Sequence, residues 1–141
     1  MLVVRILLAM LALSPTRGDA DTLFRTQIAS AILDGTDDVR EQEVLLRLAW
    51  FESNYRRHVA SCAVKGDHGK SLGLFQIQPR SEDDRREACG TLQAQVRVAL
   101  RFIRRSLEVC AENVGSAKLN LYVSGRCDRG HAASRERWGA P

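Results

Sequence analysis

The sequence has 141 residues, of which 45% are hydrophobic, 27% charged and 6% aromatic. This composition is typical of one compact globular domain and excludes a disordered, collagenous or coiled-coil protein. Lys and Arg number 21 against 17 Asp and Glu, which gives a formal charge of +4. Such a basic balance suits an acidic polymer as partner without identifying one.

Residues 1–20 have the pattern of a secretory signal peptide. Arg5 supplies early positive charge, residues 6–13 are all apolar, and Pro15 follows them. Small residues at the two cleavage-selecting positions predict cleavage after Ala20. The alternative is a membrane anchor, but the apolar run is shorter than the roughly 20 residues that a spanning helix needs. We therefore expect no stable membrane anchor.

Residues 21–141 form the predicted domain, which we expect to be mainly α-helical. Apolar residues recur at helical spacing between residues 24 and 32, and Gly35 follows as a stop signal. A second helix is predicted over residues 39–55, because spacings of three, four and seven residues return to one helix face. Glu52 shares that face with apolar side chains, which are those of Leu45, Leu48 and Ala49.

The middle of the chain alternates loops with helix start signals. Residues 56–72 lack periodicity and contain several glycines, which predicts a loop, and residues 73–79 form a short apolar segment that ends in proline. Ser81 and Asp84 have the spacing of a capping box, which predicts a short helix with acidic residues in its first turn. Thr91 is placed to cap a long helix after it.

The long helix after Thr91 has an apolar stripe that ends near Cys110, and a basic stripe on its other side. The basic residues are Arg97, Arg101, Arg104 and Arg105. A solvated helix face is the first interpretation of this stripe, and a binding surface is the alternative. A last helix is predicted over residues 116–123. No repeat and no strongly predicted strand is found.

The chain contains four cysteines, which are Cys62, Cys89, Cys110 and Cys127. An even number in a small exported chain indicates disulfides, and four cysteines allow three pairings. We favour the pairing of first with second and third with fourth, because each closes a modest local loop. The alternative is a zinc site that also uses His58, His68 or His131, but no CxxC or HxxxH spacing supports it.

Glu52 is the first candidate for a catalytic residue. A carboxyl group on an apolar stripe near a helix C-terminus loses solvation and meets the negative end of the helix dipole, so we expect its pKa to rise. A carboxylic acid that stays protonated near neutral pH can donate a proton to a leaving oxygen. The alternative is an edge glutamate that reaches solvent or pairs with Arg56 or Arg57.

Three motifs resemble those of the lytic transglycosylase family, whose lysozyme-like domain is also similar to goose-type lysozyme. Residues 50–55 read Trp-Phe-Glu-Ser-Asn-Tyr, residues 73–77 read Gly-Leu-Phe-Gln-Ile, and residues 121–125 read Leu-Tyr-Val-Ser-Gly. The family has Glu-Ser at a helix end, then a Gly-Leu-Met-Gln-Ile type segment, then Tyr-Asn-Ala-Gly. The resemblance covers residues 39–127 and implies a lysozyme-like single domain. Phe75 replaces the usual methionine, and Val123 replaces the asparagine.

The resemblance implies a role for five residues. Glu52 is the sole catalytic acid and base, and Ser53 lies beside the N-acetyl group of the sugar. Gln76 binds or orients the glycan, Gly73 allows close approach of the backbone, and Tyr122 forms a hydrogen bond near the catalytic carboxyl. Ordinary helix packing is the alternative for Tyr122.

The implied reaction is non-hydrolytic cleavage of the β-1,4 bond between MurNAc and GlcNAc in peptidoglycan. Glu52 protonates the glycosidic oxygen and then, as a carboxylate, helps the C6 hydroxyl attack C1 to give a 1,6-anhydro product. No metal or cofactor is implied. The implied partner is the glycan strand, and the protein is expected to be an exported monomer, periplasmic or secreted, which could work beside a cell-envelope machine.

Two other functions remain open from the sequence. A muramidase, which is a hydrolase, needs a second carboxylate to activate water, and Asp67 is the candidate, although Asp beside Gly is also typical of a turn. A non-catalytic peptidoglycan-binding module is the other alternative, because Val123 departs from the third motif. Nucleic-acid binding is disfavoured, since aromatic residues for base stacking are few and no recognised motif is present.

Overall fold

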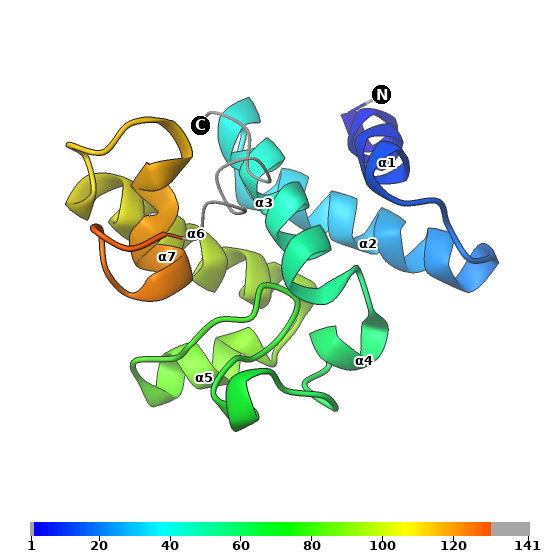
Figure 1. Cartoon of the computed structure of the whole chain (residues 1–141). Helices are drawn as coiled ribbons and strands as arrows, with labels where there is room; N and C mark the ends of the chain where they lie inside the picture. Colours follow the sequence, from blue (N-terminus) through cyan, green and yellow to red (C-terminus); the bar gives the residue numbers. More distant parts are fainter. Residues whose placement is uncertain (1, 131–141) are drawn as a thin grey trace.

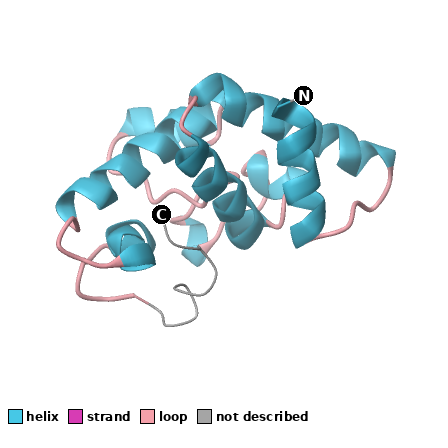
Figure 2. Ribbon diagram, turned by 90° about the horizontal axis from the view of Figure 1, so that it is seen from above, coloured by secondary structure: helices cyan, strands magenta, loops and turns pink. Residues whose placement is uncertain are grey.

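The computed structural model describes residues 2–130, and all regular elements in that range are helical. This confirms the expected mainly α-helical class. Figure 1 shows the arrangement of the helices, and Figure 2 shows the same helices from above. The elements are α1 (Leu2–Leu13), α2 (Asp19–Gly35), α3 (Val39–Ser53), α4 (Arg57–Ala60), η1 (Asp67–Gly69), α5 (Glu82–Ala88), α6 (Leu92–Val109), η2 (Gly115–Leu119) and α7 (Asn120–Ser124).

Helix α6 is the centre of the fold. It contacts α2, α3, α5, η2 and α7, and in Figure 1 it has α5 below it and α7 at its left end. Val98, Ala99 and Ile103 on its inner face are fully buried. The apolar stripe predicted for this helix is therefore the part of the core that the other helices share.

The helix starts follow the polar residues that the sequence places there. The side chain of Ser81 accepts a hydrogen bond from the Asp84 amide, and that of Thr91 accepts one from the Ala94 amide. Asp38 caps α3 in the same way. Each bond satisfies an amide that has no partner within its own helix, so the predicted starts of α5 and α6 are confirmed.

The basic stripe of α6 is largely neutralised by acids from other helices. Arg101 pairs with Asp84 and Glu87 of α5, and a nitrogen of Arg104 lies 2.8 Å from a carboxylate oxygen of Glu41 in α3. Arg97 also lies near Glu87. The stripe is thus an exposed helix face, as in the first interpretation, and three of its arginines also join α6 to acids of α3 and α5.

The two disulfides have the pairing that the sequence favoured. Cys62 is bonded to Cys89, which ties the loop after α4 to the end of α5, and Cys110 is bonded to Cys127. All four cysteines lie among the described residues, and none of them is left as a free thiol. Disulfides are typical of proteins that fold in an oxidising, exported environment.

The segment predicted as a loop contains more local structure than expected. The short helix α4 and the turn η1 lie within it. An antiparallel bridge between Gly66 and Ser71 encloses η1, and a second one joins Leu72 to Ile77. These turns are too short to show periodicity, which explains why the sequence pattern did not reveal them.

The leader region forms helix α1, which ends where the apolar run ends. Ile6 and Met10 are buried where α1 packs against α2 and α3. The predicted cleavage point after Ala20 falls in the first turn of α2. Within residues 2–130, no helix has the length and apolar character needed to cross a membrane.

Candidate functional site

Glu52 is the second-last residue of α3, as expected for a carboxyl group at a helix end. Leu45, Leu48 and Ala49 on the same face are fully buried, whereas Glu52 is half-buried. The helix stops because Asn54 adopts the left-handed conformation, with φ of 53°. The apolar face of α3 therefore ends in a carboxyl group at the rim of the core.

Tyr122 of α7 lies close enough to Glu52 for their charges to interact. Burial raises the pKa of the Tyr122 hydroxyl well above its usual value, and the negative charge of Glu52 raises it further. The hydroxyl donates a hydrogen bond of 2.7 Å to the backbone carbonyl of Phe75. Residues of all three sequence motifs therefore come together at one place.

Helix α7 itself is positioned by a buried serine of α6. The Ser106 hydroxyl donates to the carbonyl of Lys118 at 2.7 Å and accepts from the amide of Tyr122 at 3.2 Å. Ser106 is fully buried. The sequence analysis did not identify this residue, because a serine on an apolar helix face has no distinctive motif.

Gly73 permits a close approach of backbone, although the approach is to the protein itself. Its φ is 74°, and a side chain there would collide with the carbonyl of Ala88 and approach the amide oxygen of Gln95. Only glycine fits both conditions. The segment that follows Gly73 is thereby held against the end of α5.

Gln76 lines a hollow of about 280 Å³ together with Tyr122 and Val123. Its side-chain amide donates to the Gly73 carbonyl at 2.9 Å, which folds the side chain over its own turn. The amide group retains acceptor capacity. Gln76 and Tyr122 are therefore the two predicted site residues that share a cavity.

Ser53 is only 4% exposed, and its hydroxyl donates to the carbonyl of Ala49 at 2.6 Å. This is an ordinary bond of a serine to the preceding helical turn. The hydrogen of the hydroxyl is thus used within α3. Contact between Ser53 and an N-acetyl group stays a prediction.

Val123 is half-buried and packs against the core while it also lines the hollow beside Tyr122. An asparagine at this position would offer the hollow an amide, whereas valine offers only methyl groups. At this position the wall of the hollow is accordingly apolar, while Tyr122 and Ser124 of α7 also line it.

Gln95 of α6 holds the apolar segment, residues 73–79, in place. It is 3% exposed, and its oxygen accepts from the Leu74 amide at 2.7 Å. Its nitrogen donates to the carbonyls of Ala60 and Gly90, both at 2.9 Å. One side chain thereby connects α6 with α4, the end of α5 and the segment after Gly73. The sequence signal was a polar residue inside the apolar stripe of α6.

Asp67 has the features of a turn residue. Its carboxylate accepts from the Ser71 hydroxyl at 2.5 Å and from the Gln78 amide at 3.2 Å. These two bonds lower the pKa of Asp67, because they favour the ionised form. The carboxylate is therefore ionised at neutral pH and engaged with its own loop.

The described residues contain no cluster of three or more His, Cys, Asp or Glu side chains that could hold a metal ion. His131, named in the zinc alternative, lies outside the described residues. The chemistry that this arrangement offers is proton transfer by a half-buried carboxyl group beside a neutral phenol and a polar hollow. Comparison with protein families, with curated proteins and with solved structures yielded no match to this chain.

Proposed function

We propose that this chain is an exported peptidoglycan lytic transglycosylase with a lysozyme-like fold. The observation that carries the proposal is the meeting of three distant segments: Glu52 at the end of α3, Phe75 in the apolar segment, and Tyr122 of α7. These segments hold the three motifs that resemble the family. Export is supported by the two disulfides and by the signal-like residues 1–20.

In the proposed reaction, protonated Glu52 donates its proton to the oxygen that links C1 of MurNAc to C4 of GlcNAc. The bond from C1 to that oxygen breaks, and GlcNAc leaves with a new C4 hydroxyl. The Glu52 carboxylate then takes the proton of the MurNAc C6 hydroxyl as O6 bonds to C1. The proton count on Glu52 is restored, and no second carboxylate is needed.

Tyr122 is a positioning residue in this proposal. Its only hydroxyl hydrogen is used by the Phe75 carbonyl. Because its pKa is raised, the phenol stays neutral and adds no second negative charge beside Glu52. The tyrosine therefore fixes the distance between α7 and the segment that carries Gln76.

The product distinguishes this proposal from the two alternatives. Purified exported protein would be incubated with peptidoglycan sacculi, and the released muropeptides analysed by mass spectrometry. We expect products lighter by one water than hydrolytic muropeptides. Products with ordinary reducing ends would instead indicate a muramidase and direct attention to Asp67. Binding to sacculi without any product would indicate a non-catalytic module.

The proposal predicts that Glu52→Gln abolishes cleavage without loss of the fold. Glutamine keeps the shape but has no transferable proton, so we expect product formation to fall by at least about 100-fold. The matched control is Glu43→Gln on the same helix, whose carboxylate pairs only with Arg47 at the surface among its described contacts. Equal activity of Glu52→Gln and the control, with equal unfolding temperatures, would refute the mechanism.

A further inference from the structure

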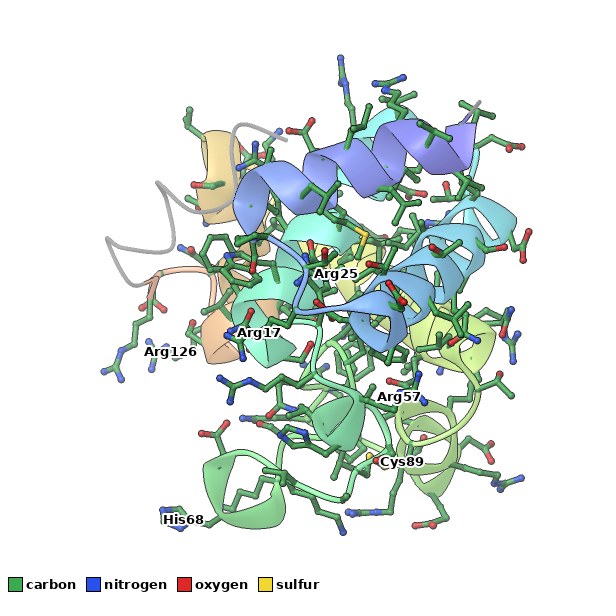
Figure 3. The ribbon with its side chains drawn as sticks, turned by 90° about the vertical axis from the view of Figure 1, so that its right-hand side faces the viewer. Arg17, Arg25, Arg57, His68, Cys89 and Arg126 are labelled. Carbon is green, nitrogen blue, oxygen red and sulfur yellow. A yellow bond between two sulfur atoms is a disulfide. The ribbon has the colours of Figure 1, made fainter. Side chains whose placement is uncertain are left out.

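Another pocket, which we call the arginine pocket, lies at the α3 terminus and shares no lining residue with the hollow that holds Tyr122. It has a volume of about 260 Å³ and is formed by the start of α2 and the chain from Asn54 to His58. Figure 3 looks toward this side and labels Arg17, Arg25 and Arg57. The cationic residues that line it are Arg17, Arg25, Arg56, Arg57 and His58.

Most of these cations lack the acidic partners that Arg97, Arg101 and Arg104 of α6 have. Within residues 2–130, no carboxylate forms an ion pair with Arg17, Arg56 or Arg57. The single acid of the arginine pocket, Asp21, is already paired with Arg25 at 3.0 Å. Like charges that surround one hollow repel each other, and an anion bound there removes that repulsion.

The buried side chain of Arg25 forms the floor of the arginine pocket. The residue is 2% exposed, and its guanidinium stacks over the Tyr55 ring at 5.0 Å. Its two terminal nitrogens donate to backbone carbonyls of the leader, Ser14 at 2.6 Å and Pro15 at 3.2 Å. These two carbonyls and the carboxylate of Asp21 thus already occupy the donors of the guanidinium that a ligand carboxylate would bind.

Removal of the leader would change this arrangement in favour of an anion. Cleavage after Ala20 takes away the carbonyls of Ser14 and Pro15, so the terminal nitrogens of Arg25 lose those acceptors. It also removes Arg17 and creates a positively charged amino group on Asp21 at the edge of the same pocket. The number of positive charges is kept, and the guanidinium of Arg25 keeps the Asp21 carboxylate as its partner in place of three acceptors.

We propose that the arginine pocket binds a carboxylate of the peptide stems attached to peptidoglycan glycan strands. This inference rests on the proposed function, because it takes the substrate class from there. The pocket begins at Asn54, two residues after Glu52, so it lies at the end of the helix that carries the proposed catalytic residue. Peptide-bearing strands are then preferred over strands without peptides.

The test measures binding without turnover. The Glu52→Gln protein is purified after export, its N-terminus is determined by mass spectrometry, and a synthetic stem tripeptide is titrated into it by calorimetry. We expect binding that weakens by roughly tenfold or more in Arg56→Gln/Arg57→Gln, because bonds to charged groups are lost. The matched control is Arg105→Gln on α6, outside the pocket, which should bind the tripeptide unchanged.

Two further arms identify the ligand. The tripeptide with amidated carboxyl groups should not bind, and 0.5 M NaCl should weaken binding of the charged form, since exposed charges are screened. Equal affinity of the double variant, or of the amidated peptide, would overturn the proposal. The proposal would also be overturned if inorganic phosphate bound to the protein and the tripeptide did not, since that result indicates a phosphate site.

Arg57 also stacks on the Phe24 ring at 5.2 Å, so its replacement can disturb the fold locally. Arg56→Gln alone avoids this problem, because no described hydrogen bond or ion pair involves its side chain. Weakened binding in this single variant with an unchanged unfolding temperature supports the proposal, and unchanged binding opposes it. Since no step requires cleavage, failure here is distinct from failure of the Glu52 mechanism.

Discussion

Tyr122 and Gln95 show how single side chains connect the elements of the candidate site. Tyr122 connects α7 to the carbonyl of Phe75, and Gln95 connects α6 to the amide of Leu74. The two hydrogen bonds hold the neighbouring residues Leu74 and Phe75, one from α6 and the other from α7. Gln76, the next residue of that segment, is thereby fixed in the hollow.

We expect Tyr122→Phe to lower product formation by roughly five- to tenfold, because the Phe75 carbonyl loses its partner and the segment loosens. The hydroxyl does not titrate in the assay range, since its pKa lies well above it. The pH profile of kcat should therefore keep its shape, and steady-state rates from pH 4 to 9 measure this. An inflection lost from that profile would show that Tyr122 itself transfers a proton.

Gln95→Ala should destabilise the fold by about 3 kcal/mol, because it leaves a buried amide, a buried carbonyl and a part-buried carbonyl without their partner. Urea unfolding followed by circular dichroism measures this difference. Gln93→Ala is the matched control, since Gln93 is exposed on the same helix. A Gln95→Ala protein as stable as the control would contradict the structural role assigned here.

The turns between α4 and α5 are held by their neighbours and not by their own hydrogen bonds alone. Asp67, His68 and Gln76 all have positive φ, which is unfavourable for residues with side chains. The disulfide from Cys62 to Cys89 and the amide of Gln95 fasten this region to α5 and α6. The element that carries Gln76 is therefore a product of packing.

Two glycines in this region allow the free-energy cost of a positive φ to be separated from the cost of a steric collision. Gly69 and Gly73 both have positive φ, but only Gly73 is closely covered by other atoms. Gly69→Ala should cost about 1 kcal/mol from the backbone conformation. Gly73→Ala should cost roughly 3 kcal/mol or more, because the added carbon meets the rigid Ala88 carbonyl. Thermal unfolding of both variants measures the costs, and equal costs would contradict this account.

At the scale of the whole molecule, ion pairs join α6 to the helices around it. The clearest case is Glu41 of α3, which accepts from Arg104 of α6 at 2.8 Å and 2.9 Å and also from Thr36. The bonds from Arg104 lower the pKa of Glu41, and the bond from Thr36 adds to this effect. The pair connects segments that are 63 residues apart in the chain.

The lowered pKa of Glu41 predicts how stability depends on pH. In the unfolded chain the pKa of a glutamate is about 4.3, so the contribution of Glu41 is fully present above that pH. It is lost as the pH falls through the lower pKa of the folded state. We expect the stability gap between the parent and Glu41→Gln to shrink in that acidic range, as measured by urea unfolding from pH 2.5 to 7.

The Arg104→Gln background provides the control for this pH dependence. Without the guanidinium, the main cause of the lowered pKa is absent, so Glu41→Gln should have a much smaller effect at every pH. A gap that stays constant with pH in the parent background would show that the ion pair does not stabilise the fold.

Much of the fold follows from patterns that are local in the sequence. The end of α3 at Glu52 and Ser53, the caps at Ser81 and Thr91, and the apolar face of α6 all depend on residues a few positions apart. The disulfide pairing was also anticipated, because short loops favour neighbouring cysteines. The turns within residues 56–72 were not anticipated, since they lack a repeating pattern.

The sequence by itself determined the helical class, the starts of α3, α5 and α6, and the choice of Glu52, because each depends on spacing along the chain. Only the tertiary structure brought Tyr122 to Phe75, put Gln95 beneath that segment, and gathered Arg17, Arg25 and Arg57 around one pocket. The physical reason is that these contacts join residues far apart in sequence. Their distances are set by the packing of whole helices, which no local pattern records.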